Sequence, residues 1–325
     1  MLRKNKPNAE ISNPPPTVGL GWFLLILALC SAIAGCGRST GINWSSPSRD
    51  LEKSYLLNDI PFFPQVASQC GPAALAMALV WSGVPVSPDD LASEVFTPSR
   101  KGSLQSAMIG AARRHDRIAY ELSEPEVLID EVAAGNPVIV LQNLGLSWYQ
   151  VWHYAVVIGL DLAKGNVILH SGTTPHKEIS LTVFERTWAR SDYWGLLVLP
   201  PHRLPANAKE KEYLLAVSHL ERLGRWDIAA DGYTTALSRW PDSLPAAVGL
   251  GVCLYRRGDL GAAEAHFRDA TVKFPHEGVV YNNLAQVLID RGNKAEARQA
   301  VLTAIEIGGP LKADYERTLE EIQNR

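Results

Sequence analysis

Three residues of this sequence have the types and spacing that covalent chemistry on a carbonyl group requires: Cys70, Gln65 and His153. Cys70 opens the run Cys-Gly-Pro-Ala-Ala-Leu, in which Pro72 suits the first turn of a helix because its missing N–H is no loss there. The partial positive charge at a helix N-terminus favours the reactive thiolate form of a cysteine. Cys70 is therefore a candidate nucleophile.

A thiol nucleophile also needs a base and donors for the oxyanion. His153 opens the apolar run His-Tyr-Ala-Val-Val-Ile-Gly, which is typical of a strand. A strand can hold an imidazole opposite a helix N-terminus, so His153 is the candidate base. Gln65 lies in the loop just before Cys70, where its side-chain amide and the Cys70 backbone N–H form a candidate oxyanion hole. Gln69 is the alternative donor.

Helix and strand patterns are mixed around these residues, which predicts an α+β domain over 56–201. Helices are expected over Cys70–Ser82, over Ser87 or Pro88 to Glu94, and from Gly102–Leu104 onward with Ser103 as the cap. Strands are expected over Pro137–Gln142, His153–Leu160, Asn166–His170 and Tyr193–Leu199. The cysteine then opens the first helix and the histidine opens a later strand.

The residues Gln65, Cys70-Gly71-Pro72-Ala73 and His153-Tyr154 resemble the bacteriocin-processing (double-glycine leader) family of papain-like cysteine peptidases. The resemblance covers roughly residues 56 to 200. It implies a papain-like fold in which Cys70 is the nucleophile, His153 is the base and Gln65 is the oxyanion donor. It also implies a hydrolase that cleaves peptide bonds without a cofactor.

The third catalytic residue of that family has no counterpart of the same type here. The family places an Asp, which orients the His, at the end of the next strand, and this sequence has His170 at that place. A neutral imidazole can orient His153 through one ring nitrogen, so His170 is the predicted third residue. Asn143, Asp192 and a site without a third residue remain alternatives. Asp161 is a poor one, because a straight strand puts it about 26 Å from His153 at roughly 3.3 Å per residue.

A repeated pattern occupies residues 209–325. Glycines, small residues and large apolar residues each recur at intervals of about 34 residues, which is the length of a tetratricopeptide repeat. The recurring positions are Gly224, Gly258 and Gly292, then Ala229, Ala263 and Ala297, then Tyr233, Phe267 and Val301. The pattern resembles three tetratricopeptide repeats, each a pair of helices, with a capping helix at Ala313–Gln323. Such repeats bind a protein or peptide partner on a concave surface.

Residues 1–36 have the order of parts of a bacterial lipoprotein signal peptide. Basic residues come first, and an apolar stretch then ends in Ile33-Ala34-Gly35-Cys36, which resembles a lipobox. Cys36 is thus the predicted lipidation site, and a polar linker is expected over 37–55. An uncleaved membrane helix is the alternative, and both readings place the rest of the chain outside the cytoplasm. Because Gly37 follows Cys36, a lipid anchor in the outer membrane, facing the periplasm, is expected for a Gram-negative host.

Composition narrows the possible partners. The net charge is −3 with acidic and basic residues interspersed, so no surface for nucleic acid is predicted. The histidines show no paired spacing of the zinc type, and no metal site is expected. Cys253 falls on an apolar helix face in the repeats, which leaves Cys70 as a free thiol.

The resemblance and the targeting segment together predict a lipid-anchored cysteine peptidase of the cell envelope. Its substrate is expected to be a peptide or protein, and its repeats are expected to recruit a protein partner. A papain-like acyltransferase that uses the same residues and a non-catalytic scaffold or adaptor remain open alternatives. The run Lys101–Gln105 and the aromatic residues Trp148, Tyr149 and Trp152 are candidates for the walls of a substrate groove.

Overall fold

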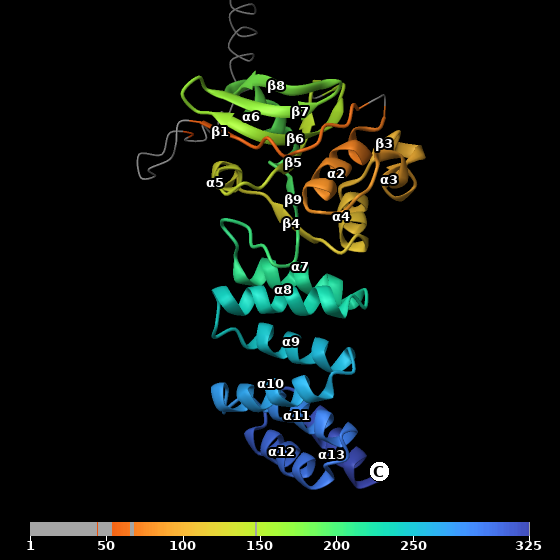
Figure 1. Cartoon of the computed structure of the whole chain (residues 1–325), viewed down its shortest axis with the longest axis vertical. Coiled ribbons are helices and arrows are strands. Elements are labelled where there is room, and N and C mark those ends of the chain that lie inside the picture. The colour runs from red at the N-terminus through yellow and green to blue at the C-terminus, as the bar shows by residue number, and fades with distance from the viewer. Residues whose placement is uncertain (1–43, 45–53, 66–67, 147, 325) are drawn as a thin grey trace, which may run out of the picture. The chain divides into compact units, whose positions relative to one another are not determined.

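A computed structural model describes residues 44, 54–65, 68–146 and 148–324. The predicted signal peptide (1–36), the lipidation site Cys36 and most of the linker (37–55) lie outside the described residues. Within the described part of the chain, no helix is both long and apolar enough to cross a membrane. An α+β domain comes first and a run of helices follows it, as Figure 1 shows.

The centre of the α+β domain is an antiparallel sheet, seven-stranded in the described residues, with the order β4-β9-β5-β6-β7-β8 and with β1 paired to β6. Its strands are β1 (Ser54–Leu56), β4 (Ile118–Leu122), β5 (Val138–Asn143), β6 (Trp152–Asp161), β7 (Asn166–Ser171), β8 (Thr174–Ser180) and β9 (Gly195–Leu199). A separate short pair joins β2 (Phe96–Thr97) to β3 (Gly102–Ser103). The helices of this domain are α2 (Cys70–Trp81), α3 (Pro88–Val95), α4 (Gln105–Arg114), α5 (Val127–Ala133) and α6 (Leu181–Trp188), with 3-10 turns η1 (Pro98–Arg100) and η2 (Ala189–Ser191).

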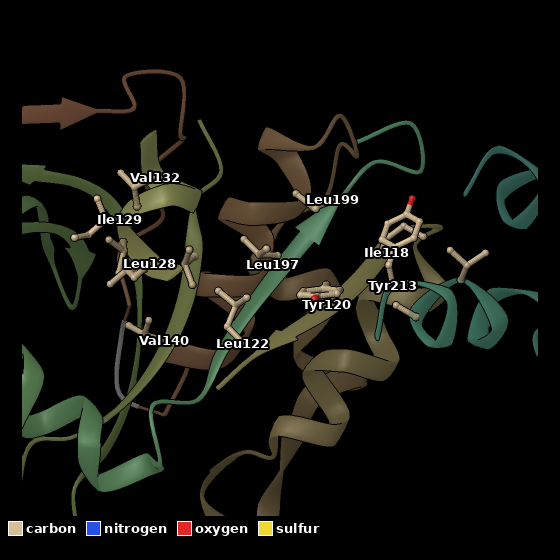
Figure 2. Packing of buried hydrophobic residues seen from close by; sticks show 14 of the residues in the cluster. Ile118, Tyr120, Leu122, Leu128, Ile129, Val132, Val140, Leu197, Leu199 and Tyr213 are labelled. Carbon is tan, nitrogen blue, oxygen red and sulfur yellow. The ribbon is translucent and has the colours of Figure 1, made fainter. Parts of the chain in front are cut away.

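Both faces of the sheet are apolar, because successive side chains along a strand point to opposite faces. Ile118 of β4 and Val157 of β6 belong to one core, which α5 and α6 cover. Their neighbours Ala119 and Val156 belong to the other core, which α2, α3 and α4 cover. Figure 2 shows part of the first core, where side chains of α5, β4 and β9 pack together. The central strands β5, β6 and β9 are therefore largely continuous apolar runs in the sequence.

The predicted helices and strands lie close to the observed ones, with one correction. The helix expected from Gly102 begins only at Gln105, and Gly102 and Ser103 instead form β3. The expected cap at Ser103 is wrong, because the N-cap position is occupied by Leu104 without a side-chain hydrogen bond. The strand β8 has no sequence signal, since nearly all of its side chains are exposed and no apolar run marks it.

The helices that follow the sheet are α7 (Glu210–Arg222), α8 (Trp226–Arg239), α9 (Leu244–Arg256), α10 (Leu260–Lys273), α11 (Gly278–Asp290), α12 (Lys294–Ile307) and α13 (Lys312–Asn324). The repeated glycines Gly224, Gly258 and Gly292 lie in the turns within the first three pairs, with φ of 73°, 82° and 80°. Glycine adopts this left-handed conformation without strain. Two glycines of α9 leave room for the repeated aromatics: a Cβ on Gly249 would lie 2.4 Å from the Tyr233 ring, and one on Gly251 would lie 2.3 Å from the Phe267 ring.

The first helix of the repeats packs directly against the sheet. Tyr213 and Val217 of α7 belong to the same buried cluster as Ile118 and Tyr120 of β4. The Tyr213 hydroxyl donates to the carbonyl of Pro201 at 3.2 Å. The α+β domain and the repeats therefore share one hydrophobic core.

Glu131 of α5 fastens the segment between sheet and repeats, and its removal is expected to destabilise the protein. Its fully buried carboxylate accepts from Asn136 Nδ2 at 2.7 Å and from the backbone N–H groups of Ala206 and Asn207 at 3.1 and 3.3 Å. Glu131→Ala leaves these three donors without an acceptor, and each unsatisfied buried group costs about 1–3 kcal/mol. We expect the free energy of unfolding, measured in urea, to fall by at least that much.

The matched control for Glu131 is Glu126→Ala. Glu126 lies at the start of the same helix, is exposed and makes no side-chain cap bond. Its replacement is expected to change the free energy of unfolding by less than about 0.5 kcal/mol. Equal effects of the two substitutions would show that the hydrogen bonds of Glu131 contribute nothing to stability.

Candidate active site

Cys70 is the first residue of α2, and the rest of that helix is anchored in the core. Side chains from Ala73 to Leu79 are at most 1% exposed, so the helix is held firmly against the sheet. The start of α2 has neither a side-chain cap nor an acidic residue in its first turn. The positive end of the helix dipole therefore acts on the Cys70 sulfur without a competing carboxylate on the same turn.

The wall beside Cys70 is built by Gly71, Ser103 and Tyr154. A Cβ on Gly71 would lie 2.2 Å from Ser103 Oγ, so only glycine fits directly after the cysteine. The Ser103 carbonyl accepts from the Tyr154 hydroxyl at 3.1 Å. Tyr154 is itself buried and packs edge-on against Trp194, with ring centroids 5.9 Å apart. Tyr154, the neighbour of His153 in β6, therefore links that strand to Ser103 beside the start of α2.

His153 is the second residue of β6, and its ring is held by Ser171 at the end of β7. The distance from His153 Nε2 to Ser171 Oγ is 3.0 Å. When Nε2 carries the proton, it donates to Ser171 and leaves Nδ1 free as a base. Ser171 is the residue that orients the His153 ring in this structure.

His170 lies elsewhere, and the prediction that it orients His153 does not match the structure. Its Nε2 lies 3.2 Å from the carbonyl of Ile60, and its Nδ1 accepts from the backbone N–H of His176 at 3.3 Å. In the register of β6 and β7, His170 pairs with Val156, which faces the α2 side of the sheet. Because one step along a strand reverses the face, Ser171 and not His170 can meet His153.

Gln65 is tied to the same turn as Ser171. Its Oε1 accepts from the backbone N–H of Gly172 at 2.7 Å, and its own backbone N–H donates to the Gly172 carbonyl at 2.9 Å. Its Nε2 donates one hydrogen to the Tyr154 carbonyl at 3.1 Å. An amide nitrogen has a second hydrogen, and Gln65 lines the same cleft as Cys70. That second N–H is the candidate oxyanion donor.

A cleft with a volume of about 850 Å³ brings these residues together. Gln65, Cys70 and His153 all line it. The run Lys101–Gln105 forms part of its wall, as expected, and so does Trp152. Trp148 and Tyr149 are not in the wall: they lie at the tip of the loop between β5 and β6, where they are 81% and 66% exposed.

Residues 57–194 match the model of the Peptidase_C39 like family, and residues 214–278 and 262–312 match the tetratricopeptide repeat. Residues 57–194 form a C39-like domain, followed by tetratricopeptide repeats. The predicted resemblance and the predicted fold class, an α+β domain followed by helical repeats, are confirmed. No curated protein matches the chain.

Solved structures resemble each part of the chain. A Bacillus anthracis protein described as a C39-like peptidase is 19% identical, with a TM-score of 0.39, over 46% of this chain and 98% of its own. The Yersinia enterocolitica type III secretion translocator chaperone SycD is 19% identical, with a TM-score of 0.34, over 35% and 92%. The TPR2B domain of yeast Sti1, in a pHsp70 complex, is 19% identical, with a TM-score of 0.34, over 36% and 98%. These scores are low, so the family matches carry the assignment.

The electrostatics of the C39-like domain keep His153 neutral. Burial, with a smaller contribution from the positive charge of Lys177, lowers the pKa of His153 to about 4. No carboxylate in the described residues hydrogen-bonds to its ring, and a hydroxyl such as that of Ser171 stabilises an imidazolium less than a carboxylate does. The resting site therefore pairs Cys70 with a neutral imidazole.

The other candidate residues of the C39-like domain have different positions. Asp161 lies at the far end of β6 and pairs with Lys164. Asn143 Oδ1 accepts from the backbone N–H groups of Gly145 and Val151, so it shapes the loop after β5. Asp192 lines the cleft, whereas Gln69 is the N-cap of α2 and is not among the residues that line it.

Ser171, which contacts the ring of His153, was not predicted as a residue of the site. A serine beside a histidine carries no catalytic signal of its own, and only strand register shows that Ser171 reaches His153. Cys253, in contrast, lies where the sequence predicts, on the buried face of α9. Burial raises the pKa of its thiol to about 12, which makes it unreactive.

Proposed function

We propose that the chain is a lipid-anchored cysteine peptidase of the cell envelope, with Cys70 as nucleophile and His153 as base. The observation that carries the proposal is the arrangement of the cleft. Cys70 at a helix N-terminus and His153 at a strand start line one cleft, and Ser171 contacts Nε2 of the imidazole. Nδ1, which Ser171 does not contact, is then free to accept a proton, as a base must.

The proposed reaction follows from these positions. His153 takes the proton of the Cys70 thiol, and the sulfur attacks the carbonyl carbon of a peptide bond. The free N–H of Gln65 and the backbone N–H of Cys70 stabilise the oxyanion. The imidazolium then gives its proton to the departing amine, which leaves a thioester on Cys70. Water, deprotonated by His153, hydrolyses the thioester and restores the thiol; an amine in place of water would make the same site an acyltransferase.

The rest of the proposal concerns place and partner. The lipobox at Cys36 supports anchoring to a membrane, with the cleft facing the periplasm. The repeats support recruitment of a protein or peptide, because stacked helical repeats of this type form a concave surface that binds such partners. A partner held on the repeats of this chain would be kept close to the cleft.

A non-catalytic scaffold is the second candidate, and one observation favours it. The ring of His153 is oriented by a serine, and its pKa is about 4, so the thiolate–imidazolium pair of an activated cysteine is disfavoured at rest. In a scaffold, the cleft or the repeats would bind a peptide without cleaving it.

Labelling with a cysteine-directed peptidyl electrophile separates these two functions. The full chain in a neutral detergent is treated at pH 7, and the modified residue is identified by mass spectrometry. For a peptidase we expect Cys70 to react at least roughly 100-fold faster than Cys253, with most of this advantage lost in His153→Ala, since a base contributes about 10²–10⁴ to the rate. A Cys70 that reacts at the same rate with and without His153 would contradict catalysis and support the scaffold.

A further inference from the structure

Basic side chains outnumber acidic ones around the catalytic cleft. Arg100, Lys101 and Arg190 line it, and Asp192 is the acidic residue among the lining residues. The chain as a whole has a net charge of −3. The positive charge is therefore concentrated at the cleft and does not follow from the composition.

These cations are available to a ligand. Arg100 and Lys101 form the end of η1, both are exposed, and neither has an ion pair within the described residues. Arg190 donates to the carbonyls of Asn143 and Gly145, which fix its guanidinium without neutralising it. Elsewhere exposed arginines do pair with carboxylates, for example Arg257 with Asp227 at 2.8 Å.

The loop of Lys101 is also built into the site. Lys101 itself has φ of 49°, and the next residues, Gly102 and Ser103, form the strand that packs on Gly71. The charge therefore lies on a short segment whose end is fixed within contact distance of the residue after Cys70. A negative group bound by this segment would be close to the bond under attack.

We propose, resting on the function above, that the substrate is a peptide with an acidic side chain near the scissile bond, which Arg100 and Lys101 bind. Among the described residues, none of the three positive side chains of the cleft has an ion pair, so together they attract a carboxylate. A bound carboxylate reduces the electrostatic cost of a positive His153. The imidazolium forms only during the reaction. An acidic side chain is therefore expected to improve turnover as well as binding.

A peptide series with matched charge tests the inference. A single Glu is moved along an eight-residue alanine–glycine host with a fluorescent label, and each peptide has a Gln twin. Binding to full-length Cys70→Ala protein is followed by fluorescence anisotropy in neutral detergent. At one or more positions the Glu peptide is expected to bind roughly fivefold tighter than its twin, as one or two exposed ion pairs allow. The preference should disappear in 1 M salt.

Two variants with the same loss of charge locate the effect. Arg100→Gln/Lys101→Gln is expected to abolish the Glu preference, whereas Lys294→Gln/Arg298→Gln, on exposed positions of α12, is expected to leave it unchanged. Equal binding of Glu and Gln peptides at every position, or equal loss in both variants, would overturn the inference. Cleavage of the same peptides by the wild-type protein tests the two proposals separately. If Glu peptides bind more tightly but no peptide is cleaved, the proposed peptidase activity is contradicted and the preference for an acidic ligand is not. If the Glu and Gln peptides are cleaved at the same rate, the preference for an acidic substrate is contradicted and the peptidase activity is not.

Discussion

Peptide cleavage is expected to disappear in Cys70→Ala and to persist in Cys253→Ala. The sulfur of Cys70 is the atom that forms the thioester, and loss of the nucleophile from such a site removes on the order of 10⁴-fold or more of the rate. Cys253 is the matched control because it is the other cysteine of the described residues, is buried, and has a pKa raised to about 12. The measurement is the initial rate on a quenched fluorescent peptide library.

Cys70→Ala is expected to remove the thiol without disturbing the fold. Alanine retains the Cβ and favours a helix, so the start of α2 and the contact of Gly71 with Ser103 are unaffected. Unchanged thermal unfolding of Cys70→Ala is the accompanying check. Residual cleavage at the wild-type rate in that variant would contradict the assignment of Cys70 as nucleophile.

Ser171→Asp is expected to change the pH dependence of the reaction and the reactivity of Cys70. In the wild type the base is neutral above a pKa of about 4, so kcat/KM should fall only as the pH drops towards 4. A carboxylate next to Nε2 favours the charged imidazolium, which raises the pKa of His153. The acid limb of the profile should then move up by about one pH unit or more. Alkylation of Cys70 by iodoacetamide at pH 7 should become faster, because the imidazolium stabilises a thiolate.

Two neutral replacements separate charge from geometry at this position. Ser171→Asn has a similar size to Asp but no charge, so the acid limb should stay near pH 4. Ser171→Ala removes the acceptor for the ring, and turnover should fall about fivefold, since one hydrogen bond is worth about 1 kcal/mol and 1.4 kcal/mol is a factor of ten. An acid limb that moves equally in the Asp and Asn variants would show that the pKa of His153 does not control it.

How much of this site could be read from the sequence depends on the scale of the feature. Cys70 and His153 are marked by strong local patterns, a Cys-Gly-Pro helix start and an apolar strand, and both lie in the cleft. The fold class and the repeats are predicted from patterns that extend over many residues, so a misassigned residue does not change the prediction. The third residue depends on the pairing of β6 with β7, where a difference of one residue decides between His170 and Ser171. No local pattern contains that information.

The same limit applies to the elements that lack an apolar face. The side chains of β8 are exposed along almost its whole length, and backbone pairing with β7 holds the strand in place. No pattern of apolar residues in the sequence predicts this pairing. The correction at Ser103 has a similar cause. Ser103 fits the preference for a helix cap, but its carbonyl is bound by Tyr154, far along the chain. At Ser103 a contact between distant segments overrides the local preference, whereas β8 is held by backbone pairing with the strand just before it.

The contact of α7 with the sheet limits how this protein can be divided into fragments. Tyr213 and Val217 fill a core that β4 and α5 leave open, and Glu131 binds the chain just before α7. A C39-like domain cut free before residue 209 would carry a bare apolar face, and repeats moved to another protein would lack their first neighbour. Separating the two parts therefore exposes apolar surface on both, and a stable fragment of either one requires new polar residues at this junction.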